Sequence, residues 1–140
     1  MLRSRIVVSG ALACAALAGV AVMAGAAASA PEPLVVEISI HYSHFQPSAI
    51  SVPAGRPVTF VIDNTDPIDH EWIVGDEAVH ARHRTGTEPT HGARPTEQSI
   101  APGGRVETIV TFAEPGVLTY VCHLPGHEAY GMVGTLTVVP

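Results

Sequence analysis

The residues best suited to chemistry lie close together near the C-terminal end of the 140-residue chain. Cys122, His127 and Met132 follow one another with a C-x4-H-x4-M spacing, so one short loop offers a thiolate, an imidazole and a thioether. This soft donor set suits copper if a second imidazole comes from elsewhere, and His70 is the candidate. Two His and one Cys in a plane with a weak axial Met form a type 1, or blue-copper, electron-transfer site. The four residues therefore predict such a site.

Zinc is the alternative metal for these residues. Cys122 with His70 and His127 could hold zinc, but structural zinc sites use a fourth ordinary donor and often contain paired cysteines. A two-copper centre would require a second Cys inside the loop, and the loop has none. We therefore expect one type 1 copper per chain.

The first 30 residues have the pattern of a secretory signal peptide. Arg3 and Arg5 precede an apolar run over residues 6–28, and Ala28-Ser29-Ala30 forms an A-x-A cleavage site. A retained membrane anchor is the alternative, because the apolar run is long enough to span a bilayer. We expect the segment to be removed.

Removal of this segment leaves residues 31–140 as one copper-binding domain, exported to the periplasm or the extracellular space. Cys14 lies in the removed segment, where lipid attachment is a minor alternative, so Cys122 is the one thiol left in a compartment that favours disulfides. Such a thiol serves as a free nucleophile, an intermolecular cross-link or a metal ligand. The nearby His127 and Met132 favour the ligand.

The predicted mature domain is strongly acidic. Thirteen acidic side chains stand against five arginines and no lysine, a formal charge of −8. This charge argues against nucleic acid and anionic membrane surfaces as partners. A redox protein, basic at its docking face, remains as the expected partner, and we expect a monomer that does not insert into the membrane once the signal is cleaved.

Short β-rich runs must position the ligands. Runs of Val, Ile, Thr and Phe alternate with turn clusters of Pro, Gly, Asn and Asp. The spacing predicts an all-β fold, an antiparallel Greek-key β-sandwich or barrel of seven to eight strands. The expected strand runs are 34–40, 45–52, 58–62, 71–74, 98–101, 106–112, 117–122 and 133–139.

An immunoglobulin-like sandwich is the alternative β fold, because Tyr120 lies two residues before Cys122. That fold needs a second Cys, and residues 31–140 contain none. Tyr120 and Trp72 are expected in the core in either case. His123 should point away from Cys122 and lie at the surface or behind the ligands.

The segment 75–95 interrupts the strand pattern. It is polar, long for a loop, and carries His80, His83 and His91. Residues 77–84 are expected to form one or two helical turns with His80 and His83 on one face. The three histidines are consistent with a plain surface, a pH-responsive loop or a second, weaker metal site.

The ligand loop resembles that of the cupredoxins. The stretch from Tyr120 to Gly134 carries the resemblance, and its C-x4-H-x4-M spacing is most similar to rusticyanin-like, sulfocyanin-like and exported copper-resistance members. The pattern from Phe45 to Phe60, followed by Asn64 and His70, is similar to the first half of that family. The resemblance covers roughly residues 34–140 apart from the His-rich segment.

The resemblance implies three equatorial ligands and one axial ligand, namely His70, Cys122, His127 and Met132. It also implies that electrons leave through the exposed edge of His127. One departure is Glu71, because many members have Asn, Asp or Ser after the first His, where it helps to tie the two ligand loops together.

Three function classes follow, in order of expectation. A one-electron carrier needs only the copper site and a docking face. A copper-resistance or copper-delivery protein would use the same site with additional His ligands. An enzyme ranks last, because it would need further copper domains or a substrate site that about 110 residues do not supply.

Overall fold

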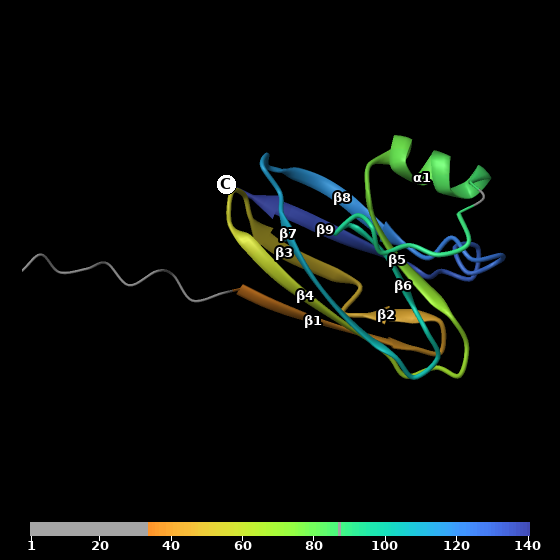
Figure 1. The fold of residues 1–140 in the computed structure, drawn as a ribbon. Helices are drawn as coiled ribbons and strands as arrows, with labels where there is room; N and C mark the ends of the chain where they lie inside the picture. Colours follow the sequence, from red (N-terminus) through yellow and green to blue (C-terminus); the bar gives the residue numbers. More distant parts are fainter. Residues whose placement is uncertain (1–33, 87) are drawn as a thin grey trace, which may run out of the picture. The chain divides into compact units, whose positions relative to one another are not determined.

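The structure is a computed structural model that describes residues 34–86 and 88–140, so the predicted signal peptide lies outside the described residues. The described part contains nine strands and one helix (Figure 1). In chain order these are β1 (Leu34–His41), β2 (His44–Gln46), β3 (Ala49–Pro53), β4 (Pro57–Asn64), β5 (His70–Gly75), α1 (Glu77–Thr85), β6 (Glu97–Ile100), β7 (Arg105–Thr111), β8 (Gly116–Val121) and β9 (Val133–Val139).

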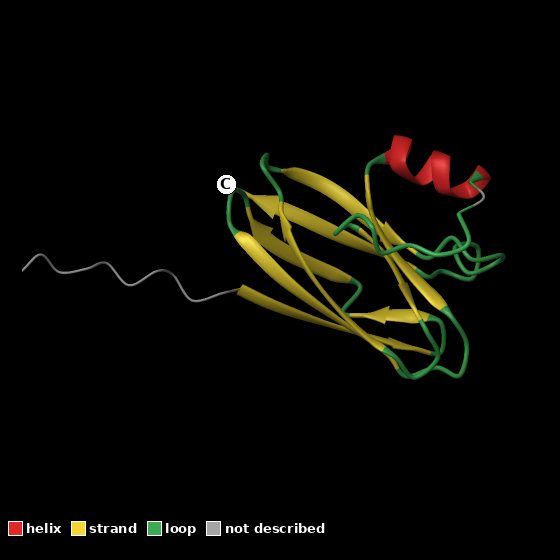
Figure 2. Ribbon diagram, in the orientation of Figure 1, coloured by secondary structure: helices red, strands yellow, loops and turns green. Residues whose placement is uncertain are grey.

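The strands form two sheets that face each other across the core (Figure 2). One sheet has the order β2-β1-β4-β7 and the other the order β3-β9-β8-β5-β6. The predicted two-sheet β-sandwich is thus confirmed. The strand number is nine because the expected run 45–52 breaks at Pro47: β2 pairs with β1 in the first sheet, and β3 pairs with β9 in the second. Proline has no N–H to give to a ladder, which favours a break there.

The expectation of purely antiparallel pairing was wrong for two strand pairs. β1 pairs with β4 in parallel, and β3 pairs with β9 in parallel. After β2 the chain crosses to the other sheet as β3 and returns as β4 beside β1. Such a crossover is what a parallel pair requires, and a hairpin cannot supply it.

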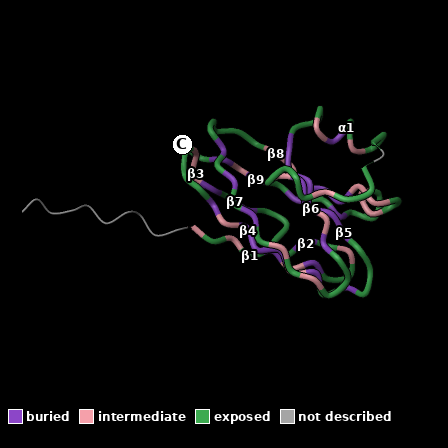
Figure 3. Tube along the Cα trace, viewed as in Figure 1, coloured by how far each residue is buried: buried purple, intermediate pink, exposed green. Residues whose placement is uncertain are grey.

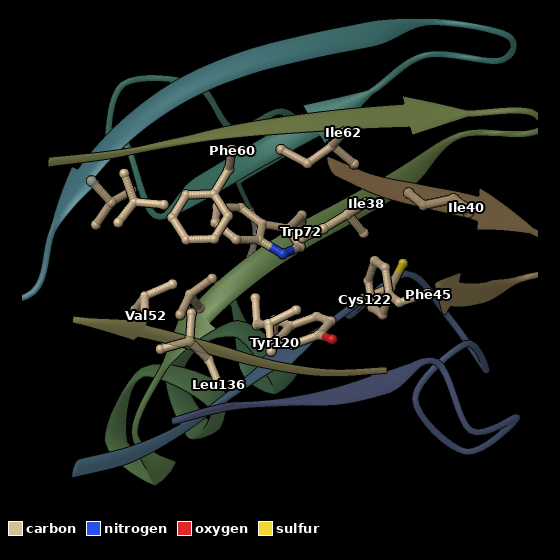
Figure 4. Close-up of a cluster of buried hydrophobic side chains, with 14 of the residues drawn as sticks. Ile38, Ile40, Phe45, Val52, Phe60, Ile62, Trp72, Tyr120, Cys122 and Leu136 are labelled. Carbon is tan, nitrogen blue, oxygen red and sulfur yellow. The ribbon is translucent and has the colours of Figure 1, made fainter. Parts of the chain in front are cut away.

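Large aromatic side chains fill the space between the sheets (Figure 4). The rings of Phe60 and Trp72 lie 4.9 Å apart between centroids, and those of Phe45 and Tyr120 lie 5.1 Å apart. The Tyr120 hydroxyl donates to the Pro47 carbonyl at 2.7 Å. The core positions predicted for Trp72 and Tyr120 are confirmed, since both side chains are fully buried.

The helix α1 lies outside the sandwich and packs against β5 (Figure 3). Asp76 caps its first turn by accepting from the Val79 N–H at 3.0 Å, and basic side chains occupy its last turn, as the helix dipole favours. Every residue of β5, which lies between β8 and β6 in its sheet, is buried. The expected helical turns are confirmed. No helix in the described part of the chain is long and apolar enough to cross a membrane.

Candidate metal centre

The predicted copper ligands meet at one end of the sandwich. His70 is the first residue of β5, Cys122 follows β8 directly, and His127 lies in the connection to β9. One ligand atom from each of these side chains lies within 4.8 Å of the others. The fold therefore brings together residues that are more than fifty positions apart in the sequence.

The thiol of Cys122 is buried and held by contacts from both ligand segments. Its Sγ atom accepts from the Glu71 main-chain N–H at 3.3 Å and lies 3.3 Å from His127 Nδ1. The hydrogen bond that joins the segment of His70 to the segment of Cys122 is thus donated by the main chain of Glu71 and does not depend on the side chain at that position. Burial raises the pKa of the Cys122 thiol to about 11, so metal binding near neutral pH must displace a proton.

The imidazole of His70 is oriented by a carboxylate. Its Nε2 atom lies 3.0 Å from Asp66 Oδ2, which fixes the proton on that nitrogen. The other ring nitrogen, Nδ1, is buried and has no hydrogen-bond partner. A buried imidazole nitrogen with a free lone pair needs a partner, and a metal ion beside Cys122 and His127 would supply it. The residues present therefore fit copper.

Asp66 also organises the turn beside the site. Its carboxylate accepts from the main-chain N–H groups of Tyr42 and Ser43 at 2.8 and 2.7 Å, and both residues have positive φ. Burial opposes ionisation, yet these bonds and His70 hold the pKa of Asp66 below its usual value. In the sequence, Asp66 belongs to a turn cluster, and its four-residue spacing to His70 is the one signal of this role.

Replacing Asp66 with Asn should destabilise the metal-free protein by about 2 kcal/mol at neutral pH, because hydrogen bonds to a charged acceptor are lost. A carboxylate with a lowered folded-state pKa contributes stability above its unfolded pKa and loses it as the pH falls through the folded value. The difference from the wild type should therefore shrink in acid. Urea unfolding at several pH values measures it, with the exposed Asp69→Asn as control. A pH-independent difference would contradict the role of the charge.

Met132 lies opposite Cys122 where β8 and β9 meet. The Cys122 N–H donates to the Met132 carbonyl at 3.2 Å, which continues the ladder one pair beyond Val121 and Val133. Residues directly opposite in a ladder project to the same face of the sheet, so the thioether and the thiol share one face. The Met132 side chain is fully buried.

The ligand loop between these strands is closed by its own hydrogen bonds. His127 N–H donates to the Leu124 carbonyl, and Met132 N–H donates to the His127 carbonyl, each at 3.0 Å. Gly126 has a φ of 86°, which a side chain would strain. Burial, with His70 nearby, lowers the pKa of His127, which favours the neutral imidazole that ligation requires.

The histidines of the segment 75–95 divide into two groups. His83 and His91 lie together with Glu97, one ligand atom of each within 4.8 Å of the others. His80 is not in this group: its Nδ1 lies 2.9 Å from His123 Nε2, and its Nε2 lies near the Thr119 hydroxyl and the Gly75 carbonyl.

His123 is not a surface residue, because α1 covers it and leaves its side chain 3% exposed. Its Nδ1 atom lies 3.3 Å from Glu128 Oε2. Burial lowers the pKa of His123 to about 4, so the ring is neutral at ordinary pH. His123 therefore lies behind the ligands, against the helix.

Comparison with known proteins shows the family of the chain. Residues 12–138 match the family described as the Cupredoxin-like domain. The chain belongs to the cupredoxin family. This cupredoxin is 31% identical to the copper-resistant cuproprotein CopI of Pseudomonas aeruginosa, with 75% of the chain and 76% of that protein covered. It is 32% identical to auracyanin-B of Chloroflexus aurantiacus, with 69% of the chain covered but only 47% of that protein.

Solved structures resemble this cupredoxin in the same way. Reduced auracyanin from Roseiflexus castenholzii superposes with a TM-score of 0.64 at 26% identity, covering 76% of the chain and 97% of that structure. About three quarters of this cupredoxin thus superposes on nearly the whole auracyanin structure.

Proposed function

We propose that this cupredoxin is an exported type 1 copper protein that carries single electrons. His70, Cys122 and His127 would bind the copper in a plane, and Met132 would be the weak axial ligand. Copper bound there supplies a reversible Cu(II)/Cu(I) couple. The residues of the chain hold the ligands, orient His70 through Asp66 and exclude water. We propose no catalytic role.

The observation that carries this proposal is the unpartnered Nδ1 atom of His70, buried within reach of Cys122 and His127. Two imidazoles and a thiolate without a fourth ordinary donor favour copper over structural zinc. The fully buried Met132 on the same sheet face as Cys122 agrees with a thioether as the fourth, weak ligand.

The surface near the ligands suits a transient redox partner. Tyr42 and Tyr130 are 79% and 78% exposed, and Ile68 is also exposed. Each lies in a segment that contacts the site: Tyr42 binds Asp66, Ile68 precedes His70 in the same connection, and Tyr130 follows His127. Apolar side chains of this kind on an otherwise acidic protein fit a brief encounter with a protein that is basic around its own redox centre.

The direct test is addition of Cu(II) to the purified domain of residues 31–140, with the visible spectrum and the bound copper measured together. One copper per chain with an intense thiolate-to-copper band is expected. The copper-loaded protein should then accept and return one electron reversibly in voltammetry. A colourless complex would contradict the type 1 assignment.

A second candidate function is copper resistance, by binding or delivering copper. It is favoured by the similarity to the copper-resistant cuproprotein CopI and by the additional His residues around α1. A delivery protein should pass its copper to a chelating acceptor protein within minutes, whereas a carrier should keep copper through many redox cycles. Measuring copper retention during repeated cycling separates the two functions.

Met132 should tune the site rather than hold the metal. Met132→Leu is expected to retain copper and raise the reduction potential, because loss of a weak donor favours Cu(I), and Met132→Gln should lower it. A tenfold change in the relative affinity for the two oxidation states shifts a one-electron potential by about 59 mV. Voltammetry of the two variants measures the shift. Loss of copper from the Leu variant would mean that Met132 is a main ligand.

Acid should raise the reduction potential, with His127 as the group that takes up the proton. His70 is fully enclosed and bound to Asp66, whereas His127 is only half-buried on its loop. Protonation of a ligand in the reduced state stabilises Cu(I), so the potential rises as the pH falls through that ligand's pKa. Potential against pH, followed by NMR of the reduced protein, identifies the imidazole. A flat potential would mean that both ligands stay bound.

A further inference from the structure

A second group of potential ligands lies on the other side of β5 from the copper site. His83 comes from the last turn of α1, His91 from the segment that follows, and Glu97 from the first position of β6. All three side chains are 5% exposed. They are thus held by the fold and are not projecting from a free loop.

The three side chains converge on a single carboxylate oxygen. His83 Nε2 lies 3.5 Å and His91 Nδ1 lies 4.0 Å from Glu97 Oε2, and the two imidazole centroids are 4.9 Å apart. Ligand atoms of a tetrahedral ion with metal–nitrogen bonds of about 2.1 Å lie roughly 3.4 Å from one another. The two distances to Glu97 Oε2 exceed this value by roughly 0.1 and 0.6 Å, and the ligand atoms of the three residues all lie within 4.8 Å of one another. Small side-chain movements would therefore let the three donors bind one ion.

One hydrogen bond to His83 and one carboxylate contact to His91 favour the tautomers that present nitrogen lone pairs to this point. His83 Nδ1 donates to the Val79 carbonyl at 2.8 Å, which leaves Nε2 unprotonated in the neutral ring and facing the Glu97 carboxylate. His91 Nε2 lies 3.5 Å from Glu71 Oε1, so Glu71 can hold the proton there while Nδ1 faces Glu97. Ligating histidines commonly give their other N–H to a carbonyl or a carboxylate in this way.

The local charge favours a cation. Glu71, Glu88 and Glu97 face the imidazoles, and the guanidinium groups of Arg82 and Arg94 pair with Glu97 at 2.7 and 3.0 Å. Three carboxylates against two guanidinium groups leave one negative charge. Both arginine side chains are more than half exposed, so they can turn to solvent. Glu88 Oε2 lies 3.2 Å from His91 Nδ1 and could serve as a fourth ligand to a bound metal ion.

A hollow of about 750 Å³ opens onto this group from solvent and supplies an entry path. Its lining includes Glu71, His83, Glu88 and His91. We propose that His83, His91 and Glu97 form a second metal site, which binds a divalent ion of borderline softness such as Zn(II) or Cu(II). Two imidazoles and a carboxylate without a thiolate suit these ions. Glu97 replaces His80 in the second site predicted from the sequence.

The test is calorimetric titration of the copper-loaded domain with Zn(II), while the visible band reports on the copper site. One Zn(II) per chain is expected, without loss of the band. His91→Asn and Glu97→Gln should each weaken Zn(II) binding at least about tenfold. His44→Asn removes an exposed histidine outside the group and should leave the affinity unchanged. Persistence of the band shows that each variant is folded.

The same titration of the double variant His70→Ala, Cys122→Ser, which lacks two ligands of the first site, makes the result independent of that site. Cu(II) added to this variant should give an axial electron paramagnetic resonance signal without a thiolate band. Absence of a second equivalent, or Zn(II) binding that survives both His91→Asn and Glu97→Gln, would overturn the proposal. The cluster would then be a network of ion pairs that holds protons instead of a metal.

Discussion

Replacing Cys122 with Ser is expected to abolish the intense visible absorption that Cu(II) should give with the wild-type protein. That absorption arises from charge transfer from a thiolate to Cu(II), and Cys122 is the one thiol in the described part of the chain. A serine hydroxyl stays protonated near neutral pH and is a much weaker donor. Absorption spectra and metal content of both proteins after Cu(II) addition measure the effect.

The control for this experiment is His44→Asn, which removes an exposed histidine and should leave the band unchanged. Protons released on copper binding give a second readout. The buried Cys122 thiol is protonated in the metal-free protein, so the wild type should release one more proton per copper than the Ser variant. A band that survives in the Ser variant would exclude Cys122 as the ligand.

Replacing Gly134 with Ala should destabilise the fold by about 3 kcal/mol, a large effect for one added methyl group. Gly134 pairs with Tyr120 across β8 and β9, and a methyl group there would overlap the Tyr120 ring. The ring cannot move away without breaking its hydrogen bond to Pro47 and its contact with Phe45. Urea denaturation of the metal-free protein measures the loss.

Changing a second glycine of the same sheet to Ala is the control, because it distinguishes the effect of overpacking from the general effect of a Gly→Ala change. A methyl group at Gly116, the first residue of β8, would have no neighbouring atom within 4 Å. Gly116→Ala should therefore be neutral or stabilise by up to about 1 kcal/mol, because it restricts the unfolded chain. Equal destabilisation by both changes would contradict the role of the Tyr120 ring.

The group of proposed copper ligands could be predicted because three of its members lie close together in the sequence. Cys122, His127 and Met132 lie within eleven residues, and thiolate, imidazole and thioether together are selective for copper. The alternating runs likewise predicted most strands. Strand pairing is different, because the parallel pairing of β1 with β4 depends on a crossover between sheets that no local pattern encodes.

The residues that support the proposed ligands could not be predicted, because their contacts also depend on the fold and not on a local pattern. Asp66 reaches both the turn after β1 and the ring of His70, contacts that depend on the folded ends of two strands. Glu97 meets His83 and His91 only because α1 folds back over β5 and β6. Acidic residues are common, and a four-residue spacing such as that from Asp66 to His70 recurs too often to identify a supporting carboxylate, so the fold is needed to distinguish Asp66 and Glu97 from the rest.

The helix α1 is bound to the loop between β8 and β9, which carries the proposed ligand His127. Arg84 binds the Glu128 carboxylate with both its Nε and Nη2 atoms, at 3.0 and 2.7 Å, and also pairs with Glu77, while His80 contacts His123 beside Cys122. Such bidentate, networked pairs hold geometry better than single surface ion pairs. The helix would thereby limit how far the loop relaxes when a bound copper ion gains or loses an electron. In the proposed electron carrier, this restraint would lower the reorganisation energy of electron transfer without contact to the metal. The rate of self-exchange would then depend on residues of a segment outside the sandwich.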